Sequence, residues 1–185
     1  MRHRLLSALA PIGLGLLTLT GCGNEGSGSD TGSNNGIDPE RVERGLAISP
    51  VPVNLEGKDR NLVGLGSYIV NAVAACNDCH TNPPYAAGGN PFAGEPEQIN
   101  TAHFLAGGTV FPQAVSSNLT PDASGLPGGL TYEEYETLMR TGTEEDGEII
   151  PVMPWPVYKS MTETDLRATY EYLRSIPAAQ PGTAP

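Results

Sequence analysis

The stretch Cys76-Asn77-Asp78-Cys79-His80 constrains this 185-residue chain more than any other feature. Two cysteines three positions apart, followed at once by a histidine, form the pattern for covalent attachment of c-type haem. Each thiol adds to one vinyl group of the porphyrin, and one helical turn presents both sulfurs to the same edge of the ring. The histidine then lies beneath the iron as an axial ligand. The motif therefore predicts one covalently bound haem c, held by Cys76, Cys79 and His80.

Two other uses of a Cys-x-x-Cys pair fit the surrounding sequence less well. A thioredoxin-like redox pair needs a βαβ context, and no such pattern surrounds Cys76. A zinc site needs two further ligands, which His80 and His103 offer, but the chain has no second cysteine pair. His103 is also a candidate for the second axial position of a haem iron, although its neighbourhood is typical of a loop.

The N-terminal residues are typical of a targeting segment. A positively charged start precedes an apolar run over residues 5–19, which is short for a membrane-spanning helix and fits a signal peptide. The run ends in Leu19-Thr20-Gly21-Cys22, which resembles the lipobox of bacterial lipoproteins, where cleavage leaves a lipid-bearing cysteine first in the chain. We therefore expect a lipoprotein signal peptide at 1–21 and lipidation at Cys22. An ordinary cleaved signal with a free thiol is the alternative.

Residues 22–38 are expected to be the lipidated N-terminus and a flexible tether. Almost all of them are small or polar, so they cannot bury enough apolar surface to offset chain entropy. Such a linker spans roughly 20–25 Å on average. It would hold a folded domain on the periplasmic side of a bacterial membrane. The outer membrane is favoured over the inner, because Gly23 rather than aspartate follows the cysteine.

The charge balance restricts the class of partner. The chain has 21 acidic and 10 basic residues, and removal of Arg2 and Arg4 with the signal leaves 8 minus 21, a net charge of −13. Nucleic acid is therefore not an expected partner. An acidic surface favours the basic face of a redox partner and salt-sensitive association, and it also serves simple solubility.

Helical periodicity appears on both sides of the motif. We expect a short helix at 39–46, within an N-terminal extension over 39–60. A second helix is predicted over 61–75, with Asn61 as N-cap and Gly66 where another helix comes close. Its apolar stripe has the spacing of a helix face and consists of Leu62, Leu65, Ile69 and Val73.

Two more helices are predicted downstream, each opened by a capping box. They cover 131–141, with Thr131 and Glu134, and 162–175, with Thr162 and Asp165. The second of them should bury a stripe that consists of Leu166, Tyr170 and Leu173.

The long segment from His80 to Leu130 is rich in proline and glycine, and little regular structure is expected in it. A bound haem would supply the core that this segment lacks. Candidate aromatic contacts to the haem are Phe92, Phe104 and Phe111.

Met153 lies in a second chemically informative stretch, Pro151-Val152-Met153-Pro154-Trp155-Pro156. The prolines stiffen the backbone and deny it a regular helix. A thioether on a stiff loop suits the sixth position of a haem iron, so Met153 is the predicted second axial ligand. The alternative is a core methionine, which is the preferred interpretation for Met139 and Met161.

This order of elements resembles class I cytochrome c: helix, Cys-x-x-Cys-His, long loop, helix, methionine loop, helix. It is also similar to haem domains in cytochrome subunits of bacterial membrane-associated dehydrogenases that oxidise alcohols, gluconate or related substrates. The matching segments are 117–122, 128–134, 138–142, 153–155, 161–166 and 172–177. Those subunits usually carry three haems, whereas this chain has one attachment motif.

The resemblance implies an all-α class I cytochrome c fold over residues 61–177, followed by a loose tail at 178–185. It also implies a first and last helix that cross tightly, and His80 and Met153 as iron ligands. The expected function is a membrane-anchored monohaem electron carrier between a dehydrogenase or respiratory complex and an acceptor, and not an enzyme. Competing interpretations are a haem enzyme acting on peroxide or thiosulfate and a haem-based gas sensor. A Met153 ligand opposes both.

Overall fold

The computed structural model describes residues 36–182, so the expected signal peptide, Cys22 and most of the expected tether lie outside the described residues. The described part is helical, with isolated bridges but no β-strand. Its elements are α1 (Pro39–Ile48), α2 (Arg60–Tyr68), the π-helix η1 (Ile69–Val73), α3 (Cys76–His80), the 3₁₀ turns η2 (Pro91–Ala93) and η3 (Thr101–His103), α4 (Tyr132–Thr141), α5 (Trp155–Tyr158) and α6 (Glu163–Leu173). None of the helices between residues 36 and 182 has the length and hydropathy needed to cross a bilayer.

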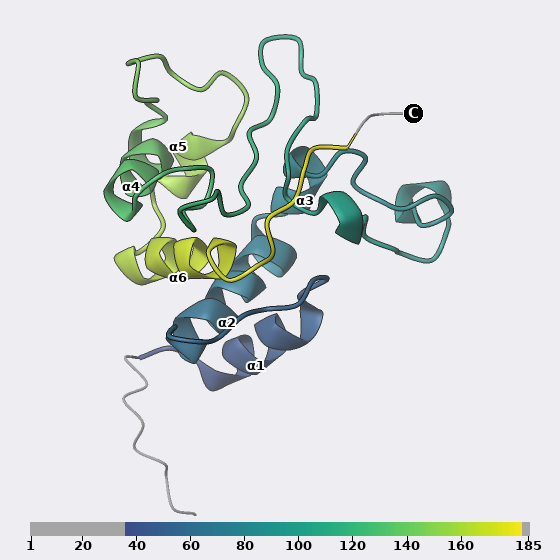
Figure 1. Ribbon diagram of the computed structural model, residues 1–185, viewed down its shortest axis with the longest axis horizontal. Helices are drawn as coiled ribbons and strands as arrows, with labels where there is room; N and C mark the ends of the chain where they lie inside the picture. The colour runs from purple at the N-terminus through teal and green to yellow at the C-terminus, as the bar shows by residue number, and fades with distance from the viewer. Residues whose placement is uncertain (1–35, 183–185) are drawn as a thin grey trace, which may run out of the picture. The chain divides into compact units, whose positions relative to one another are not determined.

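Helices α2 and α6 cross at the centre of the domain (Figure 1). A Cβ added at Gly66 would collide with the backbone carbonyl of Ala168 and lie 2.8 Å from the Cβ of Tyr172. The two backbones therefore approach each other as closely as a missing side chain permits. The prediction that another helix comes close at Gly66 is confirmed, and so is the tight crossing of the helix before the motif with the last helix.

Helix α1 packs on α2 by the same device. A Cβ at Gly45 would collide with the carbonyl of Gly64, and a Cβ at Gly64 would lie 2.6 Å from a methyl group of Val42. The hydroxyl of Ser67, buried in α2, donates a hydrogen bond to the Gly45 carbonyl at 2.7 Å. The expected helix near residue 39 therefore packs against the domain that carries the motif.

The capping boxes predicted for the last two long helices are present. In α4 the Thr131 side chain accepts from the Glu134 backbone while the Glu134 carboxylate accepts from Thr131. Thr162 and Asp165 make the same reciprocal pair at the start of α6. The predicted stripe of α6 is buried, so local chemistry and tertiary packing agree here.

The helix before the motif differs from its prediction in two ways. Its N-cap is Asp59, not Asn61, because the Asp59 carboxylate accepts from the backbone N–H of Asn61 at 2.8 Å. Its last part is a π-turn in which Ala74 N–H donates to the Ile69 carbonyl. The extra residue in that turn breaks the 3.6-residue register. Val73 is therefore rotated outwards and is 62% exposed, although it was assigned to the buried stripe.

The aromatic contacts expected in the long loop are only partly found. Phe111 lines the large cavity described below. Phe104 is instead buried in the main hydrophobic core, and Phe92 is 85% exposed at η2. The prediction is wrong for Phe104 because the core formed by α2 and α6 extends to it. It is wrong for Phe92 because the segment between α3 and η3 projects from the helices (Figure 1).

The C-terminal residues up to Gly182 are bound to the loop, contrary to the expected loose tail. Ala179 N–H donates to the Thr120 hydroxyl at 3.1 Å, and the Asn118 side-chain amide donates to the Ala179 carbonyl at 2.9 Å. His103 donates to the Gln180 carbonyl at 2.8 Å. Polar side chains of the long loop thus pair with backbone groups of this segment, a match that composition did not reveal.

Candidate haem-binding site

One cavity collects all four residues predicted to bind haem. Cys76, Cys79, His80 and Met153 line a space of about 1040 Å³, which lies at the large end of the range for small-molecule sites, about 300–1,000 Å³. Apolar side chains make up much of its wall, and they include Val70, Phe111, Leu119, Leu130, Leu138, Ile150, Val152 and Leu173. The space, the apolar wall and the donor set fit a large, mostly apolar cofactor.

Helix α3 places both thiols on the cavity wall. Ala75 has a left-handed backbone, with φ of 50°, and this turn starts α3 directly after the π-turn. Cys76 and Cys79 are three positions apart, so they lie on one face of the helix. They do not form a disulfide with each other. This is the arrangement that thioether attachment at one edge of a porphyrin requires.

Burial raises the pKa of both cysteine thiols. It raises the pKa of Cys76 to about 12, with the nearby Cys79 as a smaller cause. Burial also raises the pKa of Cys79, assisted by the carboxylate of Asp78. A thioredoxin-like redox pair depends on a lowered thiol pKa, so this environment disfavours that alternative. Within residues 36–182 no group of three His, Cys, Asp or Glu side chains could hold a metal ion.

His80 is held in one orientation by the backbone of the long loop. Its Nδ1 lies 2.8 Å from the carbonyl oxygen of Ser117. A carbonyl only accepts, so Nδ1 carries the hydrogen and Nε2 keeps its lone pair. Burial lowers the pKa of His80, and the Ser117 carbonyl partly opposes this effect. The ring is therefore neutral near pH 7, which is the form that binds iron.

The loop that carries Met153 is held against the C-terminal end of α4. The indole of Trp155, two residues later, packs directly on Gly142, which ends α4 in a left-handed turn. Ile150 N–H donates to the carbonyl of Gly142 at 2.8 Å. The methionine is thus fixed from both sides, by backbone before it and by an aromatic side chain after it. Its side chain is half-buried on the cavity wall.

The remaining candidate ligands fall into two groups. Met139 and Met161 also line the cavity; Met139 is a buried member of the main hydrophobic core, whereas Met161, like Met153, is partly buried and packs against it. His103 does not line the cavity, and its Nδ1 is used by the Gln180 carbonyl. The structure therefore places His103 away from the predicted haem ligands, as its loop-like sequence suggested.

Two tyrosines on the cavity wall were not predicted as site residues. The Tyr135 hydroxyl pairs with the hydroxyl of Thr169 at 2.8 Å, and Tyr158 donates to the carbonyl of Ala74 at 3.2 Å. Burial is the main cause that raises the pKa of both, to about 12 for Tyr158. Each hydroxyl therefore stays neutral and helps to fix the wall. The position of Tyr135 on the apolar face of α4 could have indicated a place on the cavity wall. The sequence around Tyr158 contains no comparable signal.

The mouth of the cavity is acidic. Its exposed carboxylates belong to Asp78, Glu133, Glu134, Glu144, Glu145 and Asp146. The described wall includes no lysine or arginine, and the sequence has none between Arg60 and Arg140. The acidic balance seen in the composition is thus concentrated where a docked partner would be nearest to the cavity.

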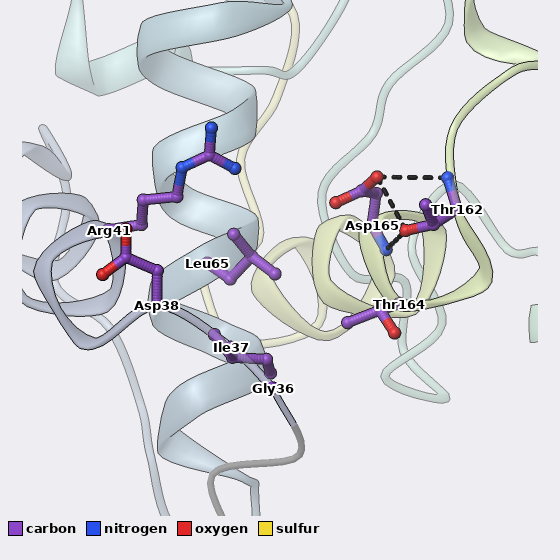
Figure 2. Close-up of a pocket in the computed structure, with 8 residues that line it drawn as sticks. All are labelled: Gly36, Ile37, Asp38, Arg41, Leu65, Thr162, Thr164 and Asp165. Carbon is purple, nitrogen blue, oxygen red and sulfur yellow. Dashed lines mark hydrogen bonds between the residues drawn. The ribbon is translucent and has the colours of Figure 1, made fainter.

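A second, smaller cavity of about 420 Å³ lies between α1, α2 and α6 (Figure 2). Its polar side chains already serve the helices: Asp38 caps α1, and Thr162 and Asp165 bond each other at the start of α6. Arg41 lies over the ring of Tyr68, 5.3 Å from its centroid. With its polar groups engaged in this way, the cavity has no set of residues that suggests chemistry.

The chain is similar in sequence to cytochrome subunits of several bacterial dehydrogenases. It is 32% identical over 144 residues to the cytochrome c subunit of the quinone-type alcohol dehydrogenase of Gluconacetobacter polyoxogenes, which covers 76% of this chain and 27% of that protein. It is 31% identical over 112 residues to the gluconate 2-dehydrogenase cytochrome c subunit of Pantoea cypripedii; the match covers 60% of this chain and 22% of that protein. It is 29% identical over 135 residues to the fructose dehydrogenase cytochrome subunit of Gluconobacter japonicus; the match covers 70% of this chain and 24% of that protein.

These relatives are much longer than the region that matches. The chain spans about a quarter of the length of each of the three. No family model matches the chain. The helical structure and the similarity together confirm the predicted all-α cytochrome c fold and the resemblance to haem domains of dehydrogenase cytochrome subunits. The relatives are cytochrome c subunits, which implies haem c.

Proposed function

We propose that this chain, which resembles haem domains of dehydrogenase cytochrome subunits, is a membrane-anchored monohaem c-type cytochrome that carries electrons between proteins. The observation that carries the proposal is the convergence of Cys76, Cys79, His80 and Met153 on one largely apolar cavity. The electron donor would be a dehydrogenase or respiratory complex, in keeping with the names of the relatives. The chain itself would make and break no substrate bond.

Each residue of the set has one role in this proposal. When bound, haem supplies an iron that exchanges one electron. Cys76 and Cys79 attach its edge through thioethers, and His80 presents Nε2 because Ser117 fixes the other ring nitrogen. Met153 would hold the iron from the other side of the haem, and a histidine–methionine pair would raise the reduction potential. The apolar wall excludes water, so little rearrangement accompanies electron transfer.

The test of this function is whether the purified, haem-loaded protein needs a protein partner to turn over. We expect rapid one-electron reduction by a candidate dehydrogenase and no sustained turnover with peroxide or thiosulfate alone. His80 and Met153 would together hold the iron, which would leave small molecules no open site on it. Multiple turnovers on either small substrate without a partner would replace the carrier by an enzyme.

We expect electron transfer to slow as ionic strength rises, because the acidic mouth of the cavity should attract a basic partner face. Glu144→Gln with Glu145→Gln, at the cavity mouth, should lower the second-order rate several-fold at low salt. The measurement is stopped-flow reduction over a range of ionic strength.

A matched pair of substitutions controls for net charge in this rate measurement. Glu40→Gln with Glu56→Gln removes the same charge from exposed positions that do not line the cavity. This pair should leave the rate close to that of the wild type. If the two pairs of substitutions changed the rate equally, or if the rate did not depend on ionic strength, docking at the cavity mouth would be contradicted.

We further propose that Cys22, which lies outside the described residues, carries the lipid that anchors the protein at the periplasmic side of the membrane. The support is the sequence Leu19 to Cys22 after a signal-like apolar run. One acyl chain gives only marginal membrane binding, so a multiply acylated cysteine would meet the need. Cys22→Ala should therefore move nearly all haem absorbance from membranes to the soluble fraction.

Fractionation of carbonate-washed membranes checks the anchor. Ser27→Ala, in the same polar segment, is the control and should remain with the membrane. If the Cys22 variant stays membrane-bound to the same extent as the wild type, the lipid anchor is refuted.

A further inference from the structure

The C-terminal segment after α6 forms a strap, defined here as residues 177–182, across the long loop. Figure 1 shows it running back from α6 towards the region of α3 and η3. His103 and Asn118 each donate a side-chain hydrogen bond to a strap carbonyl, at 2.8 and 2.9 Å. A Cβ added at Gly182 would lie 2.9 Å from the His103 ring and collide with the carbonyl of Asn82. The strap is therefore packed as well as hydrogen-bonded.

Asn118 is the centre of the contacts between the strap and the loop. Its side-chain NH₂ donates to the Ala179 carbonyl, and its side-chain oxygen accepts from the backbone N–H and the hydroxyl of Thr120, each at 2.8 Å. The Thr120 hydroxyl also accepts from Ala179 N–H at 3.1 Å, and Thr120 is 3% exposed. Asn118, Thr120 and the strap thus form one closed ring of hydrogen bonds.

This ring lies next to the group that orients His80. The residue before Asn118 is Ser117, whose carbonyl accepts from Nδ1 of His80 at 2.8 Å. The same part of the loop is tied down beyond Asn118 by Leu119 N–H, which donates to the Leu105 carbonyl at 2.8 Å. With Asn118 fixed by the strap, the peptide that carries the Ser117 carbonyl has little freedom to turn away from His80.

A well-aligned Nδ1–H···O bond makes the imidazole a stronger electron donor through Nε2. A stronger donor favours oxidised iron, and a weaker donor favours reduced iron. We propose that Asn118 and the strap are positioning groups that hold the Ser117 carbonyl on His80 and thereby tune the reduction potential. This inference rests on the proposed function, because it requires His80 to be an iron ligand. Neither Asn118 nor the strap needs to change the ligands themselves.

Two substitutions in the full-length, haem-loaded protein test the positioning role. Asn118→Leu keeps the size of the side chain, adds no charge to the cavity wall and removes both the donor to the Ala179 carbonyl and the acceptor for Thr120. Thr120→Val keeps the shape of the buried side chain and removes its hydroxyl from the ring. Both should raise the midpoint potential by up to about 59 mV. For a one-electron couple, this corresponds to about a tenfold change in the equilibrium constant between oxidised and reduced iron. Both should also make the Nδ1 proton of His80 exchange faster with solvent in NMR spectra.

The control is Asn100→Ala. Asn100 lies in the same loop and donates a side-chain hydrogen bond of the same length, 2.9 Å, to the carbonyl of Pro83. It makes no such bond to the strap or to Ser117, so its loss should leave the potential and the exchange rate unchanged. If the potentials of Asn118→Leu and Thr120→Val do not differ from that of Asn100→Ala, the positioning role is overturned.

The wild-type spectrum separates this failure from a failure of the proposed function. A spectrum without histidine and methionine ligation would overturn the proposed function and this inference with it. A normal wild-type spectrum with unshifted variant potentials would overturn the positioning role alone. If one variant does not retain haem, the other still decides, because the two remove different members of the same ring.

Discussion

Met153→Ala is expected to abolish the weak sulfur-to-iron charge-transfer band in the far red while the haem remains covalently attached. Attachment depends on Cys76 and Cys79, which lie on α3 and do not require the methionine loop. Loss of a thioether ligand should also lower the reduction potential by an amount on the order of 0.1–0.2 V, a fraction of the roughly 0.8 V range that axial ligands control. Absorption spectra and a redox titration of the purified variant measure both effects.

The other two methionines of the cavity wall are the matched controls. Met139→Leu and Met161→Leu replace the other two thioethers that line the same cavity, neither of which lies between prolines as Met153 does. Both variants should keep the far-red band, and each should cost less than about 1.5 kcal/mol of stability because the volume is nearly conserved. Survival of the band in Met153→Ala, or its loss in either control, would transfer the ligand role to another methionine.

The elements that the sequence predicts well are those whose signals are local. Thr131 with Glu134 and Thr162 with Asp165 are capping boxes that need only four consecutive residues, and both are present in the structure. The attachment motif is equally local, and it forms the single short helix that its spacing requires. Such features depend on local chemistry and not on distant contacts.

The elements that the sequence could not predict depend on distant partners. The π-turn of η1 changes which residues face the core, and no single residue in 69–73 predicts that turn. Phe104 joins the core of α2 and α6 rather than the cavity. The strap looked like a loose tail because its own side chains are small, while its bonds come from Asn118, Thr120 and His103 in the loop.

The candidate site divides along the same line. The residues that bind haem could be predicted from the sequence, because thiol, imidazole and thioether groups have specific chemistry and because prolines flank Met153. The Ser117 carbonyl was not readable, because every residue has a carbonyl and only the fold selects one. The acidic mouth is a similar case, since the carboxylates of α4 and those of 144–146 converge only after folding.

Gly66→Ala is expected to destabilise the haem-loaded protein by about 3 kcal/mol, at the upper end of the usual cost of overpacking. Alanine in a helix interior is intrinsically better than glycine by roughly 1 kcal/mol, so the steric cost must exceed that gain. The added methyl group would meet the backbone carbonyl of Ala168, which cannot move without shifting α6. Denaturant unfolding of the wild type and the variant measures the difference.

Gly88→Ala is the comparison that separates collision from backbone strain. Gly88 has a left-handed φ of 77°, and a Cβ there meets nothing within 4 Å. Its substitution should cost only the strain of that conformation, about 1–2 kcal/mol. Gly66 lies in a regular helix and has no such strain, so its cost reports the crossing alone. A smaller loss at Gly66 than at Gly88 would show that α2 and α6 can separate cheaply.

The crossing at Gly66 should also affect the haem site, because α6 and the π-helix η1, which continues α2, both contribute to the cavity wall. Val70 follows α2 and Leu173 ends α6, and both line the cavity. Separating the two helices would therefore widen the cavity and admit water beside the thioether of Met153. We expect the far-red band of Gly66→Ala to weaken at denaturant concentrations that leave the band of Gly88→Ala intact. An unaltered band throughout the unfolding transition would show that the site is independent of the crossing.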